Sequence, residues 1–181
     1  MNIFYLNHDQ KICAKEHLDK HVVKMIIEYA QLLCTAHRML DGNPYRELNK
    51  NGRRLKRWRL FDNRELVLYK ATHINHPCAI WCRQTINNYM WLYELFVSLC
   101  DEYTYRYGKT HKTDMLLRDV LKTPPHNISN GDFTSPAQAM PDKYKSTDAI
   151  QAYKDYYIFE KHSFAKWSKR NVPSWFAESV Q

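Results

Sequence analysis

Glycine and long apolar runs are both scarce in this sequence. Only 4 of the 181 residues are glycine, and few stretches alternate between apolar and polar residues, which speaks against a mostly β fold. No apolar run approaches the ~18 to 20 residues that a membrane-spanning helix requires, so we expect a soluble protein without a membrane partner. The 44% hydrophobic content is typical of a globular chain and speaks against disorder.

A complete set of paired cysteines and a secretory signal are also missing. The five cysteines are an odd number, and the opening residues MNIFYLNHDQ have neither the basic start nor the apolar core of a signal peptide. We therefore expect reduced thiols and a cytoplasmic location. One domain of 181 residues buries roughly two thirds of the surface of its unfolded chain, so it needs neither a disulfide nor a metal to fold.

Acidic residues are too few to balance the basic ones. Lys and Arg number 27 against 19 Asp and Glu, which gives a net charge of +8 and a pI of about 9.2. This excess favours an anionic partner, and we expect nucleic acid or another phosphate-bearing molecule. A basic surface that serves only solubility is the alternative.

Helical periodicity dominates the chain, and we predict a mostly α fold: a single compact domain of about five helices that spans residues 1–181. Only NIFYL, near the start, is typical of a short strand. The predicted helices cover residues 9–39, with a break allowed near Lys15, then 77–107, 110–122 and 148–169.

Two segments fall outside the helical pattern. Residues 45–71 combine an Asn-Gly turn with a basic cluster and form a basic excursion, either an insertion or a short helical one. Residues 123–146 contain four prolines and follow no period, so we predict an ordered loop that wraps around the domain. Cap signals mark the helices: His76 before Pro77, Gly108 as a terminator and Asp148 at the start of the last helix.

The segment EHLDKHVVKMIIEYAQLL, residues 16–33, places its polar side chains on one side of a helix. Advancing about 100° per residue, they share a stripe about 100° wide, and apolar residues cover the remaining arc. A helix with so narrow a polar face packs on several sides, so we expect the stripe to face a cleft. An ordinary solvated face with an i,i+4 pair is the alternative. The candidate catalytic residues on the stripe are His17, Lys20, His21, Lys24 and Glu28.

The spacing of His17 and His21 also suits a metal site, because side chains four residues apart lie on the same side of a helix. Such a site needs a third ligand. Glu28, His73 and His76 are candidates, but no spacing forces any of them close. We therefore predict neither a metal nor another cofactor, and keep a histidine metal site as an alternative.

A second polar stripe lies on the predicted helix 77–107 and contains Arg83, Asn87 and Trp91. A guanidinium, an amide and an indole together can pair with phosphate, bond base edges and stack on bases. A half-buried Trp91 and an Arg83 paired with Glu94 are the alternative. His73 and His76 flank the start of this helix, where the helix dipole favours an anion such as phosphate.

Two basic clusters extend the candidate nucleic-acid surface. The first surrounds Trp58 and includes Arg53, Arg54 and Arg57, and the second, in YRYGKTHK, includes Lys109 and Lys112. Charge runs are usually solvated faces, but interleaved aromatic residues favour contact with a nucleic-acid backbone. We predict DNA as the partner, with RNA or free nucleotides as alternatives.

The motifs DKHVVKM, NHPCAIW, EYTYRYGK and QAMP resemble those of uncharacterised phage-encoded proteins, which indicates a source, and hence the host cytoplasm, but no activity. Roughly the first 110 residues also resemble the phage pyrimidine-dimer DNA glycosylases with AP-lyase activity. Shared features are a short N-terminal segment, a long helix with EHL followed by charged residues, a basic excursion, and a long helix that ends on Tyr-Arg-Tyr-Gly.

The second resemblance implies an imine mechanism, in which an N-terminal α-amine attacks the sugar C1′ and a glutamate on the first long helix assists. Aligned on EHL, the family's histidine falls on His17, but Lys24 occupies the glutamate position, and Glu28 follows one turn later. The bulky Asn2 hinders removal of Met1, so a processed small N-terminal nucleophile is not expected.

Lys24 offers a substitute nucleophile. A lysine whose pKa is lowered by desolvation and by neighbouring cations can form the imine itself. Asp19 or Glu28 then stabilises the oxocarbenium ion, and Trp58, Trp91 or a tyrosine holds the base stack open.

The sequence therefore predicts a phage DNA-acting enzyme, a glycosylase/lyase that cleaves the N-glycosidic bond of a damaged or modified base. Two alternatives remain from other classes. One is a non-catalytic module that binds nucleic acid or a host protein, and the other is a histidine-based metal-dependent nuclease or hydrolase.

Overall fold

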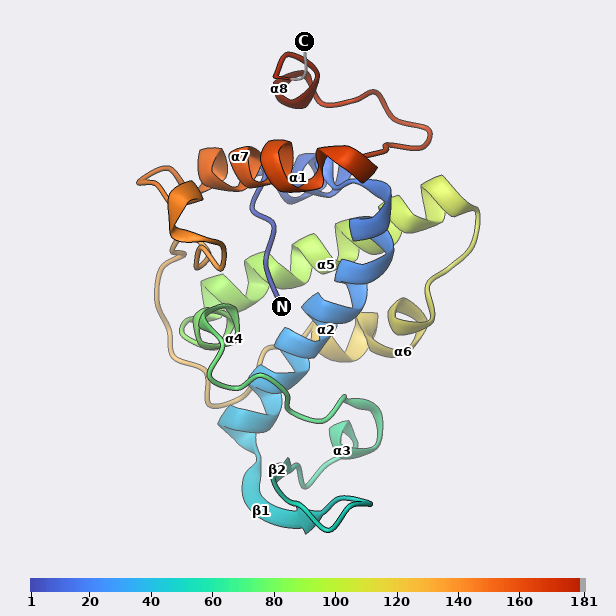
Figure 1. The fold of residues 1–181 in the computed structure, drawn as a ribbon. Helices are drawn as coiled ribbons and strands as arrows, with labels where there is room; N and C mark the ends of the chain where they lie inside the picture. The colour runs from blue at the N-terminus through green and yellow to red at the C-terminus, as the bar shows by residue number, and fades with distance from the viewer. Residues whose placement is uncertain (180–181) are drawn as a thin grey trace.

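The computed structural model describes residues 1–179 and has a mostly α-helical fold, which confirms the predicted class (Figure 1). Two long helices, α2 (Asp19–Asp41) and α5 (Ile86–Tyr107), pack against each other at the centre of the buried core. The described part contains eight α-helical segments rather than about five, because both long predicted helices are interrupted and two segments are single turns.

The predicted helix over residues 9–39 is divided into α1 (Gln10–Glu16) and α2. Asp9 caps α1 by accepting a hydrogen bond from the backbone N–H of Ile12, and the chain turns extended at His17 and Leu18. The guanidinium of the buried Arg106 donates to the backbone oxygens of Lys15 and His17. A side chain from α5 therefore satisfies carbonyls at the end of α1, which lets the helix stop there.

The predicted helix over 77–107 is likewise divided, into α4 (Pro77–Cys82) and α5. The predicted cap is present, since His76 accepts a hydrogen bond from the backbone N–H of Cys78. Thr85 caps α5 anew, and the neighbouring Ile86 N–H donates to the Ser129 carbonyl of a distant loop. Gly108 ends α5 in the left-handed conformation, with φ of 67°, as predicted.

The basic excursion is a hairpin rather than a helix. Antiparallel strands β1 (Asn43–Leu48) and β2 (Arg54–Arg59) form it, and the one-turn helix α3 (Arg64–Val67) follows. The Asn49 carboxamide accepts hydrogen bonds from the backbone N–H groups of Asn51 and Arg53, which fixes the turn. Figure 1 shows the hairpin projecting from one end of the molecule. We call residues 43–59 the basic arm.

The strand predicted at NIFYL is wrong. Residues 1–7 run in a strand-like course but join no sheet in the described part of the chain, whose one sheet is the basic arm. Ile3, Tyr5 and Leu6 are buried in the helical core. The apolar content of this segment therefore reflects burial against helices and not strand pairing.

The last third of the chain contains α6 (Lys112–Leu121), a long loop, η1 (Asp142–Tyr144), α7 (Ala149–Lys161), η2 (His162–Phe164) and α8 (Ser174–Ala177). Asp148 caps α7 as predicted, but α7 ends earlier than the predicted residue 169. Hydrogen bonds order the loop: Asn88 accepts from the Thr134 N–H, and Asp41 accepts from the His126 N–H.

Candidate active site

The beginning of the chain, α2 and α7 enclose a pocket of about 280 Å³. His21, Lys24 and Glu28 of the predicted stripe line it, so this part of the stripe faces a hollow as the helix geometry predicts. The rest of the lining comes from segments distant in sequence. It consists of Met1, Asn2, Phe4, Met25, His76, Ala139, Tyr156 and Lys161. We call this hollow the amine pocket.

Two amines meet one carboxylate in the amine pocket. The Met1 α-amine lies 3.9 Å from Oε2 of Glu28, and the Lys24 Nζ lies 3.2 Å from Oε1. The side chains of Met1 and Glu28 are 4% and 16% exposed, whereas that of Lys24 is 69% exposed. Lys24 therefore lacks the desolvation that the predicted lysine nucleophile requires, and the second amine beside Glu28 is the α-amine of Met1.

Asn2 holds the first residues in place. Its side-chain amide donates to the Ala139 carbonyl at 2.9 Å, and its side-chain oxygen accepts from the Tyr153 hydroxyl at 2.7 Å. The Phe4 N–H donates to the Tyr29 hydroxyl. These bonds to the long loop, α7 and α2 fix the direction of the chain at the pocket, so the position of the α-amine is built into the fold.

His17 does not take part in the amine pocket, although it aligns with the family's histidine. The ring is fully buried, with Nδ1 2.7 Å from the Cys13 carbonyl and Nε2 2.8 Å from the Tyr29 hydroxyl. Burial lowers its pKa to about 4. The helix breaks at this residue, so the regular rotation that joined His17 to the stripe does not apply, and the paired metal site with His21 does not form.

His21 reaches the amine pocket as a neutral ring. Its Nδ1 lies 2.6 Å from the Tyr157 hydroxyl, and its ring stacks on Phe4 with 4.2 Å between centroids. Burial, followed by the nearby charges of His17, Lys161 and Lys24, lowers its pKa to about 2. His21 can therefore exchange hydrogen bonds in the pocket but carries no charge near neutral pH.

His76 supplies a second imidazole. Because its Nδ1 accepts the N-cap hydrogen bond from Cys78, the proton of the neutral ring is assigned to Nε2. Burial, and then the positive charge of the Met1 α-amine, lower its pKa. Lys161 adds a cation, with Nζ 4.6 Å from the ring centroid of Tyr156. The site thus combines amines, one carboxylate and neutral imidazoles, a set that supports nucleophilic and proton-transfer chemistry.

The other predicted site residues lie elsewhere. Lys20 is exposed, with Nζ 4.5 Å from the Phe164 ring centroid. Arg83 donates to the Ala79 carbonyl, and the exposed Asn87 donates to Gly131. Trp91 is 8% exposed, and its indole N–H donates to His8, so it is a core residue. None of these residues lines the amine pocket, and the predicted Arg83, Asn87 and Trp91 face is interrupted by the break before α5.

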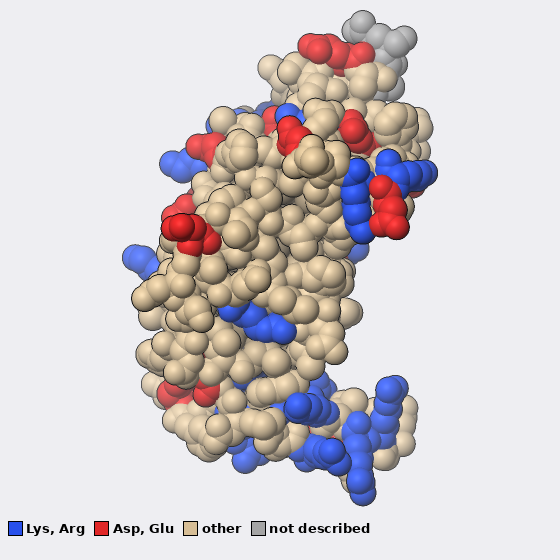
Figure 2. Space-filling model, turned by 90° about the vertical axis from the view of Figure 1, so that its left-hand side faces the viewer, with Lys and Arg blue, Asp and Glu red and all other residues tan. Residues whose placement is uncertain are grey.

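The basic arm carries seven Lys or Arg residues and one acid, Glu47. Arg53 and Arg54 are exposed, and Arg57 pairs with Glu47 at 2.7 Å. Trp58 is only 6% exposed and cannot act as an intercalating wedge. Figure 2 shows the basic side chains gathered over the arm, at the lower end of the molecule. Lys109 is exposed in the turn between α5 and α6, Lys112 is exposed as the first residue of α6, and the exposed His73 lies before α4.

Within residues 1–179, no group of three His, Cys, Asp or Glu side chains is arranged to hold a metal ion. No helix in the same range is both long and apolar enough to cross a membrane. No protein-family model, curated protein or solved structure matches this chain.

Buried neutral histidines make stability depend on pH. Burial lowers the pKa of His17 and His37 to about 4 and that of His21 to about 2, whereas an unfolded histidine has a pKa near 6.5. Between about pH 4 and 6.5 the unfolded chain therefore binds more protons, and stability must fall as the pH falls. With three such groups the slope approaches about 4 kcal/mol per pH unit near pH 5. Urea unfolding at pH 7, 6 and 5 measures this slope of the free energy of unfolding against pH.

The titration of paired carboxylates changes stability mostly below about pH 5. The change in the free energy of unfolding between pH 6.5 and 5 therefore comes mainly from the histidines. His37→Gln removes about one proton from the slope. Equal stability at pH 7 and 5 contradicts the prediction.

Proposed function

We propose that the protein is a DNA glycosylase/lyase, of phage origin, that forms an imine between the α-amine of Met1 and C1′ of a deoxyribose. The observation that supports this proposal is the Met1 α-amine 3.9 Å from Glu28, in a pocket also lined by His21 and His76. The imine mechanism implied by the family resemblance needs an amine and a carboxylate in one site, and this pocket contains both.

The chemistry starts from the unprotonated α-amine. Its lone pair attacks C1′, the N-glycosidic bond breaks, and the base leaves with the bonding electrons and a proton. The C1′–O4′ bond then opens with its electrons on O4′, which is protonated, and the nitrogen lone pair forms the C=N bond of the imine. The two protons that the amine loses balance those gained by the base and by O4′. Glu28 stabilises the positive charge that develops on the sugar and accepts a proton that the amine loses on forming the imine. At an abasic site C1′ is already an aldehyde in the open form, so the amine adds to it and water leaves.

Lys24 takes a second role in this proposal. Its Nζ shares Glu28 with the α-amine but extends into solvent, where a cation can hold a phosphate that flanks the flipped nucleotide. The basic arm then supplies the remaining phosphate contacts, mainly through Arg53 and Arg54, together with Lys109 and Lys112. A polymer of phosphates suits this spread of cations better than a free nucleotide does.

Trapping with sodium borohydride tests the proposal, because the reagent reduces an imine to a stable amine and so links protein to DNA. We expect an adduct with an abasic duplex. Trypsin should release it on the peptide of residues 1–11, whereas an adduct on Lys24 blocks cleavage after that residue. Intact mass of the purified protein establishes beforehand that Met1 carries a free α-amine.

Lys24→Ala is the matched control, and we expect its adduct to persist with weaker DNA binding. Absence of any adduct on abasic and base-damaged duplexes overturns the proposal. If salt-sensitive DNA binding nevertheless remains, the second candidate function, a non-catalytic nucleic-acid-binding module, is supported by the concentration of positive charge on the basic arm.

A further inference from the structure

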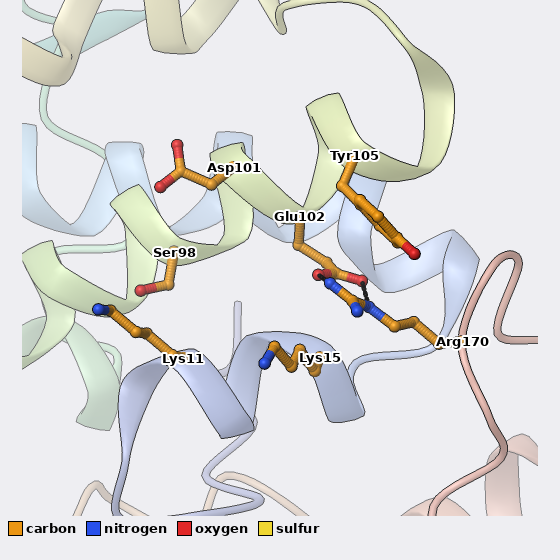
Figure 3. Close-up of a pocket in the computed structure, with 7 residues that line it drawn as sticks. All are labelled: Lys11, Lys15, Ser98, Asp101, Glu102, Tyr105 and Arg170. Atoms are coloured by element: carbon orange, nitrogen blue, oxygen red, sulfur yellow. Dashed lines mark hydrogen bonds and ion pairs between the residues drawn. The ribbon is translucent and has the colours of Figure 1, made fainter.

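A second pocket, of about 290 Å³, lies between α1, α5 and the segment before α8. Figure 3 shows Lys11 extending from α1 to the side of Ser98, Lys15 lying further along α1, and Arg170 entering from the C-terminal segment. The amine pocket and this one have no lining residue in common. We call it the lysine pocket.

The acids of the lysine pocket are already neutralised. Glu102 is buried and receives hydrogen bonds from Arg106 and Arg170 at 2.6 to 3.0 Å. Asp101 points away from both lysines in Figure 3 and pairs at 2.6 Å with Arg118, which it shares with Asp114. Neither carboxylate is therefore available as a counterion for the lysines.

The two lysines are left without a counterion. Within residues 1–179, neither Lys11 nor Lys15 forms an ion pair or a side-chain hydrogen bond. They stand one helical turn apart on α1, where like charges repel and destabilise a helix by roughly 0.2–0.5 kcal/mol. An anion between them removes this repulsion.

Arg170 adds a preoriented donor. Its Nε and one terminal nitrogen donate to Glu102, and its guanidinium stacks on the Tyr105 ring at 3.9 Å. The other terminal nitrogen has no partner among the described residues, and neither has the Ser98 hydroxyl at the opposite end of the pocket. Donors from three separate segments thus border one hollow.

We infer that the lysine pocket is a binding site for a phosphate group, held by Lys11, Lys15 and the free guanidinium nitrogen of Arg170. The tetrahedral dianion offers acceptor oxygens in several directions, which suits donors that come from α1, α5 and the C-terminal segment. The volume is several times that of one water, so it also admits part of the molecule that carries the phosphate. The inference stands independently of the imine chemistry.

Calorimetric and NMR titrations of the full chain with inorganic phosphate test the inference. We expect saturable binding below about 10 mM, with amide shifts at Ser98 and Glu102. Lys11→Ala/Lys15→Ala should bind more weakly by about a hundredfold or more, because each of the two charge-assisted hydrogen bonds that it removes is worth about tenfold or more. Both lysines are exposed and alanine favours helix, so the variant keeps its fold.

Lys122→Ala/Lys166→Ala removes the same charge at other exposed positions and should bind phosphate as the unmodified chain does. Equal affinity in both double variants, or no saturable binding, overturns the inference. Two further probes identify the source of the phosphate. Competition by an oligonucleotide without terminal phosphates indicates a nucleic-acid backbone, whereas binding of a nucleoside 5′-monophosphate alone indicates a small phosphorylated ligand.

Discussion

Replacing Glu28 by glutamine is expected to slow borohydride-trappable imine formation by about 10²- to 10⁴-fold, the usual range for loss of a positioned acid–base group. Glutamine has the same shape, but it can neither accept the amine proton nor stabilise a cationic sugar. The side chain is partly exposed and its carboxylate contacts only amines in ion pairs, so we expect the fold to remain stable.

Single-turnover trapping on an abasic duplex, with the enzyme in excess, measures this rate. Glu94→Gln, at an exposed position of α5, changes the net charge equally and should leave the rate unaltered. Equal rates for Glu28→Gln and the unmodified chain contradict the role of Glu28 even if an adduct forms. Adduct formation and the role of Glu28 are thereby tested separately.

Sequence patterns located helices more reliably than their interruptions. His76, Gly108 and Asp148 act where predicted because caps depend on neighbouring residues. The break at His17 depends on Arg106, which lies 89 residues away. Local periodicity contains no information about such a partner, so it allowed a break near Lys15 but could not place that break at His17 and Leu18.

In the amine pocket, too, the sequence predicted the residues that lie close along the chain and not the residue positioned by distant ones. The helical stripe correctly grouped His21, Lys24 and Glu28, which lie on adjacent turns of α2. Met1 was missed because its position depends on bonds from Asn2 to Ala139 and Tyr153, more than 130 residues away. The wedge role of Trp58 and Trp91 was assigned from residue type alone, and burial removes both indoles from contact with DNA.

Arg38→Met is expected to lower the free energy of unfolding by about 3 to 5 kcal/mol, because it removes a fully buried guanidinium and all its hydrogen bonds. The guanidinium donates to Glu65 at 2.7 Å and to the backbone oxygens of Trp58, Leu68, Tyr69 and Glu65. Methionine fills much of the space but leaves these acceptors without donors. Urea unfolding at pH 7 measures the loss.

Arg46→Met is the matched control for Arg38→Met. Arg46 is exposed on β1, so the same substitution there should change stability by no more than about 0.5 kcal/mol. A similar small loss at Arg38 contradicts the prediction.

A double variant identifies the cause of the loss at Arg38. Adding Glu65→Gln to Arg38→Met removes the carboxylate that the first change leaves without its buried partner. The double variant should therefore be less destabilised than the sum of the two single changes, by about 1 kcal/mol or more.

Because Arg38 bonds both Trp58 in the basic arm and Leu68 beyond α3, amide exchange in the arm should also accelerate in Arg38→Met. Exchange that accelerates equally everywhere would instead mean that Arg38 stabilises the domain as a whole without specifically anchoring the arm.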